Sequence, residues 1–242
     1  MFKKFLKMNA GDFSLYAAIT GGLFLLGEVV ILCVMAFLKP DTSIFLAGIV
    51  LPVAAAFSLL IMGLTNSSVM FDTALRFGCT RRQSLGLVAG LLALEGAFAM
   101  GLAALLALAE RFLLPGLWAK LAGFEGWKLG LSTPLPEGSV PVQAALLQIE
   151  DFVLAWWWYP LLLAAALALG LFEGALLHRF GSKGAWALWC PWMGLCFAPQ
   201  LLGDNLHLTA GWAAGLIAAG AVLALAGLAW AVWSMLHAVV RS

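Results

Sequence analysis

Charged residues are scarce in this chain of 242 residues: they account for 10% of it, whereas soluble domains carry about 25%. Apolar residues make up 64%, and the mean hydropathy is +1.02. Water could not cover a globular surface of that composition, so a soluble domain and a disordered chain are both excluded. Four cysteines are too few for a disulfide scaffold. The class that remains is a helical protein embedded in a membrane.

Charge of one sign and clustered catalytic residues are lacking as well. The net charge of +1 gives no reason to expect a nucleic-acid partner. The three histidines and four cysteines have no metal-ligand spacing, so no metal site is expected. The sequence contains no Ser/His/Asp or Cys/His grouping and no Gly-x4-Gly-Lys-Ser/Thr phosphate loop. We therefore expect no enzyme activity in this chain and no cofactor bound to it.

Long apolar runs dominate the rest of the chain. Crossing a hydrocarbon core of about 30 Å takes about 20 apolar residues in a helix. Six runs approach or exceed that length, at residues 15–38, 44–64, 85–109, 152–172, 185–202 and 211–236. They are continuous rather than alternating, which argues against a membrane barrel. We predict an all-α fold with six transmembrane helices in a single transmembrane domain over residues 1–242.

Basic residues predict the orientation, because cytoplasmic loops of membrane proteins are enriched in Lys and Arg. With the N-terminus inside, nine of the 13 basic residues are cytoplasmic. The four external ones are Lys39, Arg111, Lys120 and Lys128. Six spans then place both termini in the cytoplasm. The predicted location is a cell membrane, in the first instance the bacterial plasma membrane.

Two segments outside the spans are expected to lie at the membrane surface. Residues 1–14 carry apolar and basic side chains on opposite faces, which is typical of an interfacial helix. Residues 110–151 form a long external loop, in which we expect one or two short surface helices. Its acidic residues would favour a cationic ligand or simply form a solvated rim: Glu110, Glu125, Glu137, Glu150 and Asp151.

The cytoplasmic loop 65–84, here called the elbow, has the most informative local chemistry. Residues 66–68, Asn-Ser-Ser, favour the start of a short amphipathic helix. Gly78 predicts a left-handed turn that ends it. Thr80 and Gln83 then fit a capping box, from which a second helix runs into the third span. The elbow is therefore predicted to be rigid.

Arg81 and Arg82 fall in the first turn of that second helix. Exposed positive charge is disfavoured there by about 0.3–1 kcal/mol for each residue, because of the helix dipole. A compensating partner would be lipid phosphate or an acidic or carbonyl-rich protein surface. The preference for positive charge on the inner side would also explain both residues.

Residues 77–83, Phe-Gly-Cys-Thr-Arg-Arg-Gln, resemble the cytoplasmic coupling segment of ATP-binding-cassette (ABC) exporter permeases. Members of the type-2 export class often carry Gly-x-Ser/Thr-Arg-Arg/Lys between their second and third spans. Six spans, cytoplasmic termini and an amphipathic N-terminal helix resemble the same class. Residues 177–184 resemble its shorter contact loop.

The resemblance implies that two permease subunits pair, as a homodimer or a heterodimer, within membrane lipid. It also implies that a separate ABC ATPase subunit binds ATP and Mg²⁺ and docks on the elbow. The residues to which we assign this coupling are Phe71, Ala74, Phe77, Gly78, Thr80, Arg81, Arg82 and Arg179.

Glu28 and Glu95 lie near the middle of the first and third spans. A carboxyl at that depth is costly, so it marks a translocation path or proton site, or is a protonated group hydrogen-bonded across helices. We expect a permease subunit of an ABC exporter for an amphipathic or hydrophobic cargo, with peptides favoured. The alternative is a proton-coupled secondary transporter that uses Glu28 and Glu95.

Overall fold

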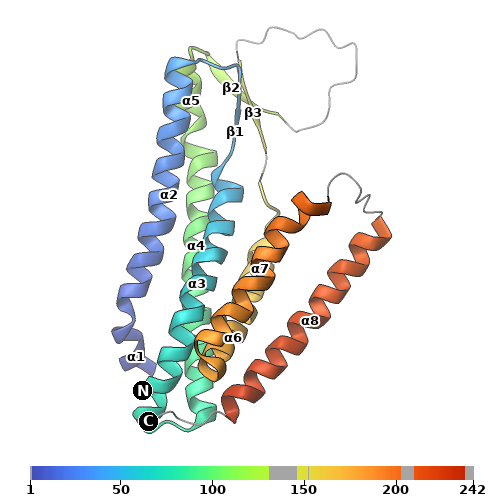
Figure 1. Ribbon diagram of the computed structural model, residues 1–242. Helices are drawn as coiled ribbons and strands as arrows, with labels where there is room; N and C mark the ends of the chain where they lie inside the picture. The colour runs from blue at the N-terminus through green and yellow to red at the C-terminus, as the bar shows by residue number, and fades with distance from the viewer. Residues whose placement is uncertain (1, 131–145, 152, 203–209, 238–242) are drawn as a thin grey trace. The chain divides into compact units, whose positions relative to one another are not determined.

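The structure is a computed structural model that describes residues 2–130, 146–151, 153–202 and 210–237 (Figure 1). Three short strands accompany the helices: β1 (Thr42–Ile44), β2 (Gly126–Gly130) and β3 (Leu146–Glu150). The helices are α1 (Phe2–Met8), α2 (Ala10–Phe37), α3 (Ala47–Arg76), α4 (Arg81–Leu113), α5 (Pro115–Ala122), α6 (Trp158–Phe180), α7 (Ser182–Leu202) and α8 (Ala210–Leu236). The mostly helical architecture confirms the predicted class.

Four helices in the described part of the chain are long and apolar enough to cross a membrane. They are α2, α4, α6 and the Ala47–Leu64 part of α3. These helices indicate a membrane-embedded protein. The predicted spans 185–202 and 211–236 correspond to α7 and α8. Within α8, the segment Val222–Leu236 is apolar but shorter than the four spanning helices. The count of six spans, the side of each terminus and the particular membrane stay predictions.

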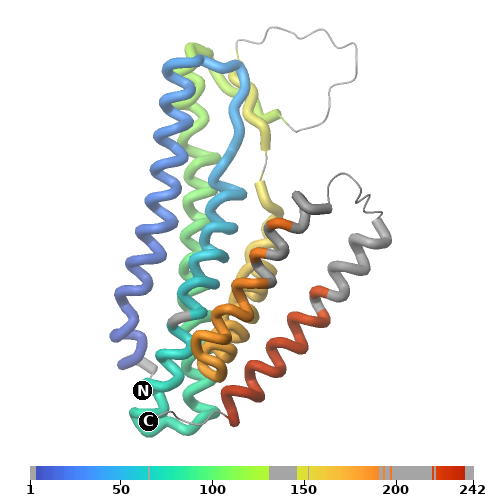
Figure 2. The backbone as a smooth tube through the Cα atoms, in the orientation of Figure 1, coloured from blue at the N-terminus to red at the C-terminus, as the bar shows by residue number. Residues whose placement is uncertain are grey.

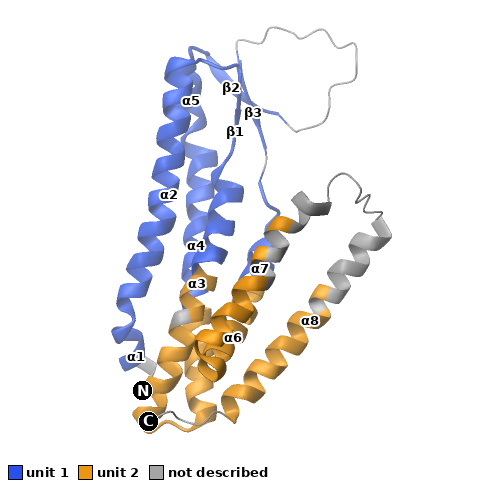
Figure 3. Ribbon diagram, in the orientation of Figure 1, with its two compact units in different colours: residues 1–58, 95–163 blue, residues 59–94, 164–242 orange. Residues whose placement is uncertain are grey.

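Contacts divide the chain into two compact units (Figure 3). Unit 1 comprises Met1–Ser58 and Glu95–Leu163, and unit 2 comprises Leu59–Leu94 and Ala164–Ser242. Helices α3, α4 and α6 each contribute one part to each unit. The elbow belongs to unit 2, whereas Glu28 and Glu95 belong to unit 1.

Unit 1 has a small parallel sheet in the order β1-β3-β2. We did not predict these strands, which lie in and before the external loop 110–151. In β3 the burial alternates, so that Leu147 and Ile149 face inward. They join Ile31 and Met35 of α2 and Trp118 of α5 in one apolar core. Helix α5 confirms the expected short helix, and residues 131–145 of this loop lie outside the described residues.

Unit 2 contains a close contact between α3 and α6 at glycines. A Cβ added at Gly63 would lie 3.2 Å from the Gly170 Cα, so a side chain there would require the backbone of α6 to shift. A Cβ at Gly174 would collide with the side chain of Ser67. Small residues allow membrane helices to pack this closely, because lipid supplies no hydrophobic force between them.

Candidate functional site

Residues 77–80 of the elbow form the turn between α3 and α4 (Figure 2). Gly78 has a φ of +81°, a backbone conformation that glycine adopts without strain. Its N–H donates to the Leu75 carbonyl at 3.0 Å, and the Cys79 N–H donates to the Ala74 carbonyl at 3.1 Å. These two bonds form the Schellman motif that satisfies the last carbonyls of a helix. The predicted turn at Gly78 is confirmed.

The capping box is also present at the start of α4. The Thr80 N–H donates to Gln83 Oε1 at 3.1 Å, and the Gln83 N–H donates to Thr80 Oγ1 at 3.4 Å. Each side chain therefore satisfies a backbone donor at the beginning of the helix. Helix α4 begins at the next residue, Arg81, as predicted. The two helical arms of the elbow are thus joined by residues 77–80. The Schellman bonds fix the backbone of this turn on the α3 side, and the capping box fixes it on the α4 side.

The predicted helix start at residues 66–68 is wrong. Helix α3 is continuous from Ala47 to Arg76, so the amphipathic arm of the elbow continues the helix that carries the second predicted span, 44–64. Ser67 does not cap a helix: its Oγ donates to the Gly63 carbonyl one turn earlier, and to the Gly170 carbonyl of α6 at 3.3 Å. A serine inside a helix has this alternative, which a sequence pattern does not distinguish from a cap.

The α3 arm of the elbow is attached to α6 through buried side chains. Phe71 and Ala74 are fully buried, and the ring of His178 meets Phe71 edge to face at 5.6 Å. His178 Nε2 lies 2.9 Å from Asp72 Oδ1. Phe71 and Ala74 were assigned to ATPase coupling, but their burial allows them only to support the elbow from within.

Other residues of the assigned set present their side chains outward. Phe77 is 59% exposed, and Thr80 and Arg82 are exposed as well. The Arg81 guanidinium donates through Nη1 to the carbonyl of Leu236 at 3.2 Å, at the last residue of α8. A helix C-terminus is rich in unpaired carbonyls and favours positive charge. One compensating partner for Arg81 thus lies within the chain itself.

Arg179 also contacts aromatic rings of unit 2. Its guanidinium carbon lies 5.7 to 5.8 Å from the ring centres of Phe180, Trp230 and Trp233, within the range of cation–π attraction. Two of these rings belong to α8. Arg81 therefore attaches α8 to α4, and Arg179 attaches α8 to α6.

Glu28 and Glu95 are both buried, with exposures of 7% and 1%. The structure does not bring them together. Glu95 lies beside Tyr16, and Glu28 lies beside Trp118 and Glu110. Tyr16 and Glu28 are 12 residues apart on α2, about 18 Å along a helix, so the two carboxyls occupy separate levels.

Each of these carboxyls leaves polar atoms without a hydrogen-bond partner. In the described part of the chain, Tyr16 lies beside Glu95 and Trp118 beside Glu28, but Tyr16 Oη, Glu95 Oε1, Glu28 Oε2 and Trp118 Nε1 form no hydrogen bond of standard geometry. Unsatisfied buried polar atoms are uncommon and mark places where a proton, a water molecule or a ligand would be held. These atoms are therefore compatible with a translocation path or proton site and with protonated carboxyls that hydrogen-bond across helices.

Glu110 was expected at the solvated rim of the external loop, and this is wrong, because it is only 1% exposed. Its two carboxylate oxygens accept hydrogen bonds from the N–H groups of Leu46 and Ala47, each at 2.9 Å. Glu110 therefore caps the N-terminus of α3 from the far end of α4. The residues before Ala47 are Ile-Phe-Leu, which offer no capping side chain. This lack of a local cap was the only sequence signal that a distant residue caps α3.

Comparisons with known proteins found no match: no protein-family model, no curated protein and no solved structure matches the chain. The described residues define a helical membrane protein with a hydrogen-bonded elbow, two separate buried carboxyls and a distant helix cap.

Proposed function

We propose that the chain is the permease subunit of an ABC exporter of the type-2 class. It pairs with a second permease subunit and is driven by a separate ATPase that docks on the elbow. The cargo is amphipathic or hydrophobic, which suits the apolar, tryptophan-rich composition, and among such cargoes we favour peptides. The resemblance of residues 77–83 to the coupling segment of that class motivates this proposal, and the geometry of the elbow supports it.

One observation carries the proposal: hydrogen bonds fix the backbone of the elbow at both helix ends, and the elbow still exposes an apolar and a basic side chain. The Schellman turn at Gly78 and the Thr80–Gln83 box hold its backbone. Phe77 and Arg82 are exposed. A coupling element needs both properties, since it must bind a partner and transmit a displacement without bending.

The proposed mechanism follows the covalent path of the chain. ATP-driven closure of the partner moves the elbow, with Phe77 in an apolar groove of the ATPase and Arg82 against an acidic surface. Helix α4 begins at Arg81 and receives the displacement directly. The Asp72–His178 contact passes the same displacement to α6. Arg81 and Arg179 hold α8 to these helices, so that the helices of unit 2 respond together.

Charge reversal at Arg82 tests this proposal. Tagged chain carrying Arg82→Glu is expected to lose co-purification of an ABC ATPase at least tenfold, because like charges would meet at the docking surface. Adding Arg81→Glu should abolish it. Lys7→Glu is the matched control, since it reverses an exposed basic charge of α1 outside the elbow. Normal ATPase binding and stimulation by the double variant, inserted in the membrane, would disprove the coupling role.

A second candidate function is proton-coupled secondary transport through Glu28 and Glu95. The unpartnered oxygens of these buried carboxyls favour it. Proteoliposomes that contain the chain alone and a trapped pH dye would then conduct protons, and Glu95→Gln would stop that flux. Transport that needs ATP and persists after the pH gradient and the membrane potential are collapsed would exclude this alternative.

A further inference from the structure

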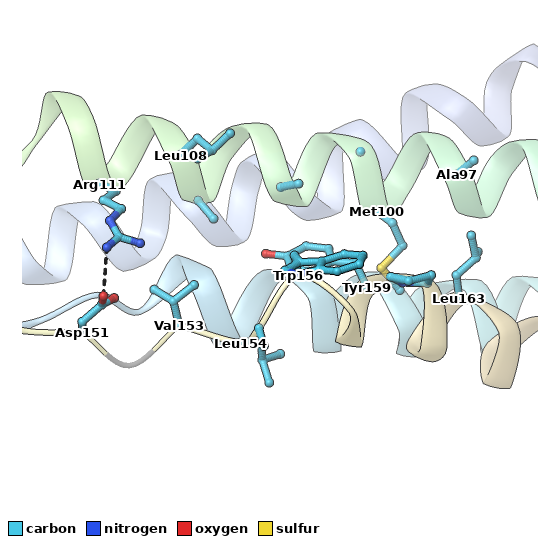
Figure 4. Close-up of a pocket in the computed structure, with 15 residues that line it drawn as sticks. Ala97, Met100, Leu108, Arg111, Asp151, Val153, Leu154, Trp156, Tyr159 and Leu163 are labelled. Carbon is cyan, nitrogen blue, oxygen red and sulfur yellow. Dashed lines mark hydrogen bonds and ion pairs between the residues drawn. The ribbon is translucent and has the colours of Figure 1, made fainter. Parts of the chain in front are cut away.

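A groove of about 780 Å³ lies within unit 1, between α4 and a wall formed by Asp151 and by residues between Val153 and Leu163 (Figure 4). One wall is a face of α4 with small side chains: Ala97, Gly101, Ala104 and Ala107. Ala97 and Arg111 both line it and are 14 residues apart on one helix, so the groove is about 21 Å long. Helix α4 is one of the apolar helices able to span a membrane.

The groove has one charged end. There Arg111 Nη2 donates to Asp151 Oδ2 at 2.9 Å, and the two side chains point toward each other (Figure 4). A guanidinium has five N–H donors, so this bond leaves donors on Arg111 for an anion. Asp151 Oδ1 is buried and is not accessible to a ligand. This end therefore offers donors to a phosphate.

The remainder of the groove suits hydrocarbon. Away from its charged end, the polar side-chain atoms of the lining are the Trp156 indole N–H and the Tyr159 hydroxyl. An extended peptide would bring an N–H and a C=O with every residue, and in a nonpolar slot each one needs a partner. An acyl chain brings none. The chemistry of the walls therefore favours a lipid tail over a peptide.

We propose that this groove binds one phospholipid: an acyl chain lies along α4 and the phosphate binds Arg111. The site holds this lipid whether or not the chain is driven by an ATPase. It is also independent of Glu28 and Glu95, which do not line it.

Gly101 provides the variant that tests the groove. A Cβ added there would meet no atom within 4 Å, so a larger side chain fits into the open space without strain. Leucine at this position would block the middle of the acyl slot. Gly86 is the matched control: it lies on the same helix, has the same open surroundings and does not line the groove.

The experiment titrates dioleoyl-phosphatidylethanolamine into the delipidated full chain in detergent and counts bound lipids by native mass spectrometry. We expect one tightly bound lipid in the wild type and in Gly86→Leu, and at least tenfold weaker binding in Gly101→Leu. Arg111→Gln should remove the preference over an uncharged diacylglycerol. Ala104→Leu, a second obstruction of the same wall, replaces Gly101→Leu if that variant does not fold.

Two results would overturn the proposal. Equal lipid binding by the Gly101→Leu and Gly86→Leu variants would show that the lipid lies elsewhere on the chain. Displacement of the lipid from the wild type by a 20-residue amphipathic peptide, blocked by the same Gly101→Leu substitution, would assign the groove to peptide instead. Neither readout involves ATP hydrolysis or transport, so failure here leaves the proposed function unaffected.

Discussion

The two ends of helix α3 are capped in opposite ways. At its C-terminus, the Schellman turn and the following capping box use residues within nine positions of one another, from Ala74 to Gln83. At its N-terminus, the acceptors come from Glu110, 63 residues away from Ala47 on another helix. The first end is built from local chemistry, whereas the second exists only once α3 and α4 have packed. The difference separates what a helix specifies for itself from what its neighbours supply.

The largest expected effect is at the distant cap. Glu110→Ala removes the acceptors of two backbone N–H groups, one of which is buried. We expect a loss of about 2–4 kcal/mol in the free energy of unfolding, because a buried donor without a partner costs about 1–3 kcal/mol. Equilibrium unfolding in mixed detergent and dodecyl sulfate, followed by circular dichroism, would measure it.

Two further variants sharpen that measurement. Glu110→Gln keeps one carbonyl oxygen and should lose only part of the stability. Glu125→Ala removes an exposed carboxylate from the same predicted external loop and should change stability by less than about 0.5 kcal/mol. Equal losses for Glu110→Ala and Glu125→Ala would mean that the distant cap contributes little.

A smaller effect is expected at the local end of α3. Gly78→Ala places a Cβ on a backbone with a φ of +81°, where L residues are disfavoured by about 1–2 kcal/mol. No atom lies within 4 Å of that Cβ, so the loss reports the backbone conformation alone. The same unfolding assay would measure it.

The control for Gly78→Ala is Gly86→Ala, a substitution in equally open surroundings but within a regular helix. There alanine should stabilise the chain by up to about 1 kcal/mol, since it favours the helix. The two substitutions are therefore expected to have opposite signs. The same sign for both would contradict the left-handed turn at Gly78.

What the sequence could predict follows the same division. Gly78, Thr80 and Gln83 were readable because their partners lie within five residues, and each residue type has one dominant use at a helix end. Ser67 was misread because serine serves equally as a cap or as a donor to the preceding turn. Its actual partners include Gly170, a contact that depends on the packing of α6 against α3.

Non-local features escaped prediction for physical reasons. Strand β1 has three residues and pairs with β3, and β3 has five residues and pairs with both β1 and β2, so their own sequences carry little signal. The buried carboxyls Glu28 and Glu95 were found, because a charged group in an apolar run is conspicuous. Their neighbours Trp118 and Tyr16 were not, because no periodic pattern links residues on separate helices.

The smallest effect concerns the capping box itself. Thr80→Ala and Gln83→Ala each remove one of two exposed hydrogen bonds, at 3.4 and 3.1 Å, and each should cost about 0.5–1 kcal/mol. Each side chain satisfies the other residue's backbone N–H. If one bond holds the geometry that the other needs, the losses in the free energy of unfolding for the two substitutions should be less than additive. A double-mutant cycle in the same unfolding assay measures this coupling. Fully additive losses would mean that the two bonds act separately, and the elbow would then owe its rigidity to Gly78 and to the contacts of α3 with α6.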